Sequence, residues 1–193
     1  MSLMYGIVAG DAHDLRNQVG GARAVRIDQS TRATTTISYE HHEIHASSLF
    51  SLQTYSDNLA NANAINIVMT TPNTTKEIHL IMEASSSLAG LFEFFTGPTV
   101  TAASGSPATP ASHNQFTPGT STTVCRTGMT VTGDGTLLYR RRLDSGSRQG
   151  LSDRGVNEWV LARNTTYLFR ISSLANSNVV NLILTFYEHT ART

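Results

Sequence analysis

Residues 63–83 read NAINIVMTTPNTTKEIHLIME, and this stretch decides the fold class. Two apolar series alternate with other residues, one on each side of a turn at Pro72. The first series is Ile65, Ile67 and Met69, and the second is Ile78, Leu80 and Met82. Alternation with a period of two places such side chains on one face of an extended strand. The stretch therefore predicts two β-strands, each with one apolar face.

Strand-like runs recur outward from this stretch in both directions. They cover residues 36–45, 49–55, 91–95, 122–126, 129–132, 137–143, 157–161, 166–171 and 179–188. Roughly nine to eleven short strands with turn signals between them, and almost no helical period, are typical of an antiparallel sandwich or barrel. We expect an all-β fold, an antiparallel jelly-roll-like β-sandwich with an extended N-terminal arm.

The composition favours sheet over helix. Ser, Thr and Asn make up 58 of the 193 residues, 26 of them Thr, and only 15% of the residues are charged. Branching at Cβ restricts a side chain in a helix more than on a pleated sheet.

Two kinds of segment depart from the strand pattern. Residues 1–35 show no sustained period, so we expect an N-terminal arm that a partner holds, followed by a β-sandwich domain over residues 36–193. Residues 96–121 contain four prolines, and residues 144–156 are polar. Both are expected to be surface loops, and long loops in compact domains are usually functional or held by partners.

The charge balance argues against a protein that coats nucleic acid. The 14 basic and 14 acidic residues cancel, and 13 of the basic residues are Arg. Coating nucleic acid requires neutralising many phosphates, whereas Arg also suits fixed, bidentate contacts to carboxylates. We therefore predict an interface with protein partners, with no nucleic-acid or membrane partner. Its candidate residues are Arg16, Arg23 and Arg26 in the arm and Arg140, Arg141 and Arg142 in a strand.

Cysteine content and hydropathy exclude further classes of protein. Cys125 is the single cysteine, which excludes an internal disulfide framework and a Cys-rich zinc site. No apolar run approaches the roughly 18 residues that span a bilayer. The N-terminus lacks the basic and apolar regions of a signal peptide, so we expect a soluble protein used without secretion.

The densest cluster of potential ligands is HHEIH at residues 41–45. On a strand, His41, Glu43 and His45 would share one face and could bind a divalent metal ion. A cupin-type site also needs a later carboxylate, and here the cluster is followed by Ala-Ser-Ser-Leu-Phe. We expect no stoichiometric metal and no cofactor. Asp134 lies in a hairpin-like turn, and no nucleophilic triad or phosphate loop is visible, so we expect no enzymatic activity.

Several scattered motifs resemble those of small virion proteins of tailed bacteriophages. They are HEIH at 42–45, TTPNTTK at 70–76, TGDGTLL at 132–138, NEW at 157–159 with NTTYL at 164–168, and FYEHT at 186–190. The resemblance spans about residues 40–190. It implies a β-rich structural protein that decorates or cements the capsid shell, often as a trimer. The expected partners are then the major capsid protein or other virion proteins and further copies of the chain. The expected location is the capsid surface, after synthesis in the bacterial cytoplasm.

Two alternatives stay open at this point. Jelly rolls also serve as lectins, so the chain could be a receptor- or glycan-binding head, or another neck or tail component. The two polar loops contain only Phe116 as an aromatic residue, which weakens the glycan-binding alternative. A cupin-like enzyme would rest on the HHEIH cluster alone.

Overall fold

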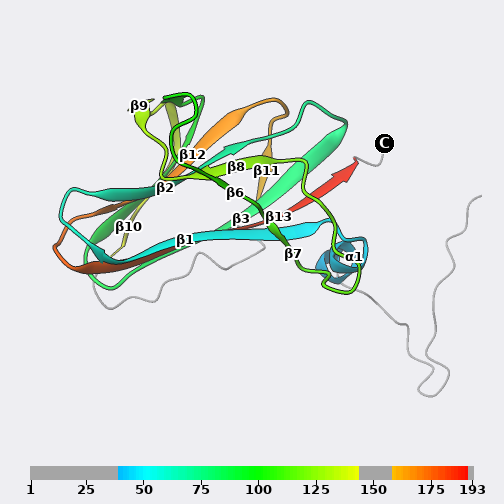
Figure 1. The fold of residues 1–193 in the computed structure, drawn as a ribbon, viewed down its shortest axis with the longest axis horizontal. Helices are drawn as coiled ribbons and strands as arrows, with labels where there is room; N and C mark the ends of the chain where they lie inside the picture. Colours follow the sequence, from blue (N-terminus) through cyan, green and yellow to red (C-terminus); the bar gives the residue numbers. More distant parts are fainter. Residues whose placement is uncertain (1–38, 144–157, 191–193) are drawn as a thin grey trace, which may run out of the picture. The chain divides into compact units, whose positions relative to one another are not determined.

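The computed structural model describes residues 39–143 and 158–190. The chain divides into two units between His42 and Glu43, and the second unit runs from Glu43 to Thr193. The second unit is an antiparallel β-sandwich of two layers (Figure 1), so the predicted all-β sandwich is confirmed. The expected arm, residues 1–35, and the polar loop at 144–156 lie outside the described residues, and a jelly-roll connectivity stays a prediction.

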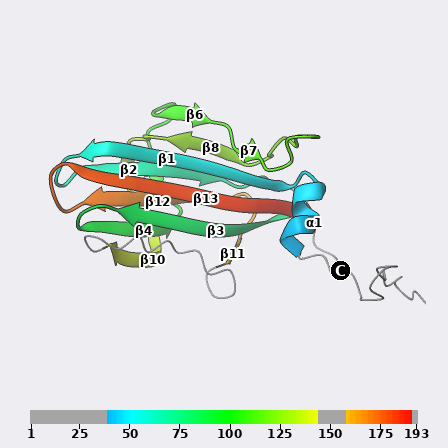
Figure 2. The same ribbon diagram turned by 90° about the horizontal axis from the view of Figure 1, so that it is seen from below.

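The first layer is a five-stranded sheet in the order β11-β3-β13-β1-β7. Its strands are β1 (Leu49–Leu59), β3 (Lys76–Ser86), β7 (Ala111–Ser112), β11 (Trp159–Leu161) and β13 (Asn178–Thr190). The central strand β13 pairs with β3 from Val180 opposite Ser86 to Thr190 opposite Lys76. Figure 2 shows β1, β13 and β3 side by side, with β2, β12 and β4 behind them.

The second layer is a six-stranded sheet in the order β10-β4-β12-β2-β8-β6. Its strands are β2 (Ala64–Thr70), β4 (Gly90–Thr96), β6 (Ser106–Ala108), β8 (Val124–Thr127), β10 (Thr136–Leu143) and β12 (Thr166–Ser173). From β1 to β4, and again from β10 to β13, each strand lies in the opposite sheet from the strand before it. The two sheets are thereby connected through many chain crossings.

The core lies between the sheets and follows the predicted alternation. Both apolar series from residues 63–83 belong to it, and Ile67, Met69 and Leu80 are fully buried. Phenylalanines dominate the centre, where the rings of Phe94 and Phe169 stack with centroids 4.7 Å apart. Burying an apolar side chain of this size contributes about 1.5–3 kcal/mol, so these residues set the pairing of the sheets.

A second, smaller apolar cluster covers the outer face of the six-stranded sheet. It contains Val68, Phe95, Met129 and Leu168, and it is overlaid by a two-stranded sheet of β5 (Thr99–Val100) and β9 (Val131–Gly133). Because β9 pairs with β5 and β10 pairs with β4, the hairpin expected around Asp134 is wrong. The turn joins two different sheets, and Gly135 adopts a φ of 82° within it.

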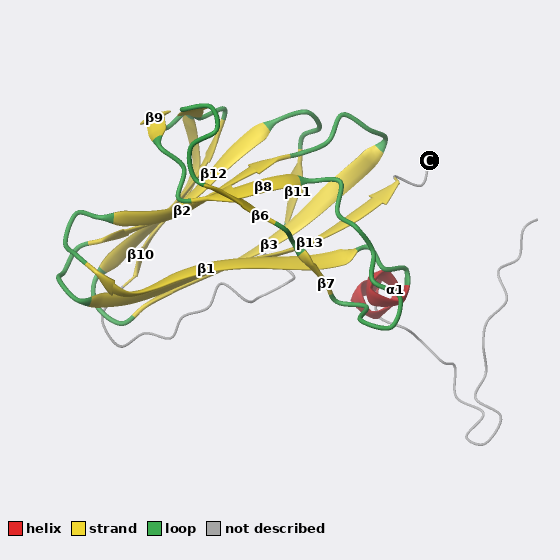
Figure 3. Ribbon diagram, in the orientation of Figure 1, coloured by secondary structure: helices red, strands yellow, loops and turns green. Residues whose placement is uncertain are grey.

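The prediction of a strand at residues 36–45 is wrong for residues 39–45, the part of that run that the structure describes. Residues Tyr39–His45 form α1, and it is the only helix among the described residues (Figure 3). The amide of Ser48 donates to the carbonyl of Glu43, that of Ser47 donates to Ile44, and Ser47 has a φ of 59°. This left-handed residue with two crossed hydrogen bonds is the Schellman helix end. His41, Glu43 and His45 therefore do not share a strand face.

The interpretation of residues 96–121 as one long loop is wrong in part. The segment contributes β5, β6 and β7, and it links the two sheets because β6 pairs with β8 while β7 pairs with β1. These strands are two or three residues long, and β6 contains Pro107. Short strands with proline are typical of sheet edges.

Candidate functional site

Two histidines and a glutamate meet at one end of the five-stranded sheet. On β3, Ile78 and Leu80 face the core, so Glu77 and His79 lie on the outer face. In the register of β3 and β13, His189 is directly opposite Glu77. One potential ligand atom from each of Glu77, His79 and His189 lies within 4.8 Å of the others. We call these three residues the His–Glu cluster.

The ring of His79 is held in place by its neighbours. Its Nδ1 atom is 2.8 Å from Oε1 of Glu158, and the same oxygen accepts a hydrogen bond from the hydroxyl of Tyr187. The rings of His79 and Tyr187 stack with centroids 4.7 Å apart, and the His189 ring lies 4.7 Å from His79. The orientation of His79 is therefore set by one carboxylate and two rings.

The cluster is half-buried, and an arginine side chain lies beside it. The side chains of His79 and Glu77 are 20% and 33% exposed, and Nε2 of His189 is buried. Nη2 of Arg163 lies 3.6 Å from Oε1 of Glu77. This is a loose ion pair whose arginine is 46% exposed, and such pairs contribute little to stability.

The sequence prediction missed this cluster. His79 and Glu77 stand two residues apart in a strand, which is the only local signal, and His189 follows 110 positions after His79. The predicted ligands at residues 41–45 lie instead within α1. A cluster formed by pairing distant strands becomes visible only with the strand register.

Glu188 is a buried carboxylate saturated with hydrogen bonds. Ser121, Thr122 and Thr123 all donate side-chain hydroxyls to it at 2.6–2.8 Å, and the amides of Thr122 and Thr123 donate at 3.0–3.1 Å. Nζ of Lys76 lies 3.5 Å from Oε2. Burial by itself would raise the pKa of Glu188, but these hydrogen bonds outweigh it and lower the pKa below its ordinary value. Through these hydrogen bonds, the carboxylate connects strand β13 to the segment that precedes β8.

Glu93 is a second buried carboxylate and lies between two arginines. Arg140 on β10 and Arg170 on β12 are its register neighbours on either side and donate to its two oxygens at 2.7–3.1 Å. Arg170 also binds Asp134 through two hydrogen bonds of 2.7 and 2.8 Å. The hydrogen bonds from Arg170 lower the pKa of Asp134. This network ties β10, β4 and β12 together on the outer face of the six-stranded sheet.

The predicted interface arginines fall into three groups. Arg140 pairs inside the chain with Glu93, although 54% of its side chain is exposed. Arg141 is half-buried, and Arg142 is exposed on the same face as Arg140. Arg16, Arg23 and Arg26 lie outside the described residues.

Phe116 is the most exposed large apolar side chain among the described residues, at 95%. Its loop is braced by Asn114, whose Oδ1 accepts the amides of Phe116 and Thr117 and whose Nδ2 donates to Ser47 at 3.0 Å. Gly119 packs so closely on this region that a Cβ there would lie 2.0 Å from the carbonyl oxygen of Ser47. The loop therefore presents Phe116 from a well-defined conformation.

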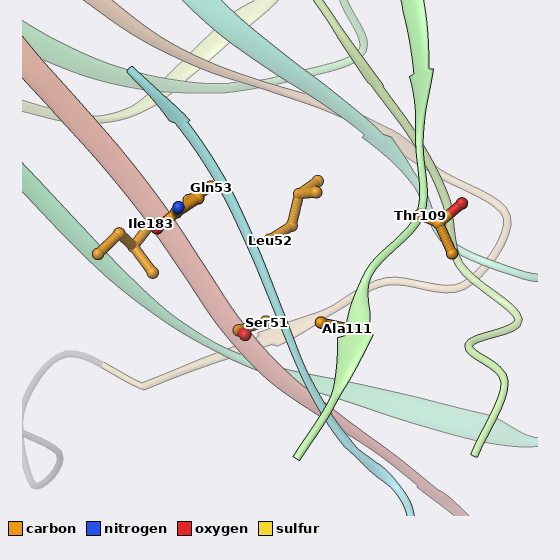
Figure 4. Close-up of a pocket in the computed structure, with 6 residues that line it drawn as sticks. All are labelled: Ser51, Leu52, Gln53, Thr109, Ala111 and Ile183. Atoms are coloured by element: carbon orange, nitrogen blue, oxygen red, sulfur yellow. The ribbon is translucent and has the colours of Figure 1, made fainter. Parts of the chain in front are cut away.

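An open pocket of about 380 Å³ lies beside β1. Its lining comes from β1, β13, β7 and the residue that follows β6 (Figure 4). The lining side chains are Ser51, Leu52, Gln53, Thr109, Ala111 and Ile183. None of the six titrates, so this lining offers apolar contact and hydrogen bonds but no acid–base group.

Comparisons with known proteins returned no match to a family model, to a curated protein or to a solved structure. Within the described residues, no helix has the length and apolar character needed to cross a membrane.

Proposed function

We propose that the protein is a non-enzymatic structural component of a tailed-bacteriophage virion that binds the assembled capsid and cements it. The virion is inferred from the sequence resemblance. The motifs that carry this resemblance fall largely on strands and turns of the sandwich. TTPNTTK contains the β2–β3 turn, TGDGTLL joins β9 to β10, and FYEHT ends β13. The location proposed is the capsid surface, and the partners are the major capsid protein and further copies of the chain as a trimer.

The presentation of Phe116 is the observation that carries partner binding. A fully exposed phenylalanine is costly in water, and an aromatic anchor buried in a partner's pocket contributes much of the affinity of a protein interface. Because Asn114 and Ser47 already fix this loop, little conformational entropy is lost when the anchor docks. The loop is thus suited to a preformed pocket on a large partner.

The buried ionic groups support a mechanical role. Glu188 and Glu93 each use their oxygens to join separate strands or segments. Such networks keep a domain rigid when both partners are satisfied. A rigid domain that binds only the assembled shell stabilises that shell by mass action, and a trimer multiplies modest single contacts through avidity.

We propose that the arm, residues 1–35, also contributes to binding of the protein to the capsid. Its sequence has no periodic apolar face, so its ordering requires an extensive docking surface, at roughly 1–2 kcal/mol per residue of backbone entropy. A neighbouring subunit or the shell would supply that surface. Deletion of residues 2–35 should leave a soluble, cooperatively unfolding domain with most of its capsid affinity lost.

Cosedimentation of the purified chain with capsids that lack it tests the function. We expect saturable binding with a fixed copy number and greater resistance of the capsids to heat. Absence of binding to capsids, with binding instead to isolated tails or to host surface glycans, would replace the proposal with the receptor- or glycan-binding head. Phe116 could stack on a sugar ring, so a glycan array belongs in the same experiment.

A further inference from the structure

We propose that the His–Glu cluster of Glu77, His79 and His189 is a binding site for a divalent first-row transition metal, with Zn²⁺ as the probe of choice. The expectation of no metal considered only the histidines at residues 41–45, which belong to α1, whereas this cluster belongs to β3 and β13. The proposal adds to the capsid-binding function and does not depend on it.

The donor set matches what such ions prefer. Imidazole nitrogen binds Zn, Cu, Fe and Ni, and two histidines with one carboxylate form a recurrent three-ligand set that leaves coordination positions for water. Glu77, His79 and His189 supply that set, with one ligand atom from each inside a 4.8 Å limit. A hard ion such as Mg²⁺ or Ca²⁺ would instead select a site built from oxygen.

The protonation of both imidazoles is arranged for metal binding. Nδ1 of His79 lies 2.8 Å from the Glu158 carboxylate, which makes this nitrogen the protonated one in the neutral ring. Nδ1 of His189 lies 3.2 Å from the carbonyl oxygen of Thr190, which can only accept a hydrogen bond. In each neutral ring, Nε2 is then the nitrogen that carries the lone pair. A carboxylate or carbonyl behind a histidine is the usual outer support of a metal ligand.

The positions of the ligands are fixed by the sheet. Glu77 and His189 are directly paired across β3 and β13, and His79 lies two residues from Glu77 on the same face. Paired residues on adjacent antiparallel strands place their Cβ atoms about 4.5–5.5 Å apart, and Glu and His side chains from such positions can converge. Tetrahedral zinc bonds of 2.0–2.1 Å separate ligand atoms by about 3.4 Å. Closing from the 4.8 Å limit therefore needs only small side-chain rotations.

Arg163 is the competitor for Glu77 and is weakly held. Its 3.6 Å contact involves Oε1 of Glu77, and nearly half of the arginine side chain is exposed. An exposed pair of this kind contributes little to stability. A metal ion can therefore take the carboxylate while Arg163 turns to water.

Metal titration of the full, tag-free chain tests the proposal. After chelator treatment, calorimetric titration with Zn²⁺ should show one equivalent bound, and Co²⁺ should give visible absorption of a low-symmetry site. Glu77→Gln and His189→Gln each remove a ligand and should weaken Zn²⁺ binding by at least the roughly 100-fold that marks the upper range for loss of an outer support. Glu158→Gln, which leaves all three ligands in place but alters the support of His79, should weaken it about 10–100-fold.

Two controls test His113 and the histidines at residues 41–45. His113→Gln alters an exposed loop histidine, and a triple variant with His41, His42 and His45 changed to Asn removes the helix-associated cluster. Both should bind Zn²⁺ as the unaltered chain does. Zinc should also raise the unfolding temperature of these controls but not of His189→Gln, whose fold is checked by its circular dichroism. The proposal is overturned if the unaltered chain binds no equivalent, or if Zn²⁺ binding follows residues 41–45 and is unchanged in Glu77→Gln and His189→Gln.

Discussion

The hydroxyl of Thr123 donates a 2.8 Å hydrogen bond to Oε1 of Glu188, across 65 positions of sequence. Thr123 leads into β8 of the six-stranded sheet, and Glu188 belongs to β13 of the five-stranded sheet. The bond therefore connects the two layers of the sandwich. It is one of several to a carboxylate whose side chain is 0% exposed.

Glu188→Gln should be strongly destabilising. The amide keeps the shape of the side chain but directs an NH₂ group at donors that require an acceptor, and it removes the negative charge. We expect the free energy of unfolding to fall by about 2–4 kcal/mol, the range for breaking a buried charged hydrogen-bond network. Urea unfolding followed by the fluorescence of Trp159, which packs against Phe94, measures this change.

Glu83→Gln is the matched control for that substitution. Glu83 lies on β3 and is half-buried. Its replacement should alter the free energy of unfolding by no more than about 0.5 kcal/mol. Equal effects of the two substitutions would show that the hydrogen bonds to Glu188 contribute no special stability.

The free energy of unfolding should decrease in acid because the pKa values of both Asp134 and Glu188 are lowered in the folded chain. The pKa of Asp134 is lower in the folded chain than in the unfolded chain, so the folded state binds this proton more weakly. The resulting stabilisation is fully present above the unfolded pKa, about 4, and is lost as the pH falls through the lower folded pKa. We expect a nearly constant contribution from pH 7 to 5 and a decline below about 4.

Asp134→Asn should make that acid dependence shallower. The variant cannot lose a proton at this position, while the same-signed contribution of Glu188 persists. Urea unfolding at a series of pH values between 7 and 2.5 compares the two slopes. Identical slopes for the variant and the unaltered chain would contradict a role of the Asp134–Arg170 pair.

Cys125 should be unreactive in the folded protein. Burial, followed by the nearby charge of Glu188, raises the pKa of its thiol to about 12. Since the thiolate is the reactive form, a disulfide reagent at pH 8 should modify Cys125 only after unfolding. An Asn73→Cys variant supplies an exposed thiol for comparison and should show one fast and one slow reaction. Rapid modification of Cys125 in the native chain would contradict its burial.

The sequence predicts those parts of the fold that depend on local alternation. The series at Ile65–Met69 and Ile78–Met82 are confirmed as core faces because a strand of a sandwich needs only a period of two to bury one side. This local rule does not specify which strands pair. The turn at Asp134 accordingly predicted a hairpin, whereas the two strands that it joins pair with β5 and β4.

Other features depend on contacts that a linear pattern does not contain. The helix at residues 39–45 has mixed residues that also fit a strand, and its end is fixed by Ser47, against which Gly119 packs. β6 and β7 are too short to give a period and exist because β8 and β1 offer them an edge. The His–Glu cluster arises from the β3–β13 register, which sets Glu77 opposite His189.

Phe116→Ser should abolish most capsid binding without altering stability. The side chain is 95% exposed, so its removal costs the folded domain no core packing and should change the free energy of unfolding by less than about 0.5 kcal/mol. As an interface anchor it should contribute at least 2 kcal/mol to binding, which is roughly a 30-fold increase in Kd. Cosedimentation with capsids that lack the protein measures the affinity.

Two further variants distinguish the loss of a specific anchor at Phe116 from a general loss of exposed apolar surface. Tyr55 is 63% exposed on β1, six residues and about 20 Å along the strand from Leu49, which lies near the Phe116 loop. Tyr55→Ser should bind capsids normally. Asn114→Ala keeps Phe116 but removes the hydrogen bonds that hold its loop, so binding should weaken to an intermediate extent because the loop must be ordered on docking. If Phe116→Ser binds as tightly as Tyr55→Ser, the capsid contact lies elsewhere on the chain and the braced loop is not its anchor.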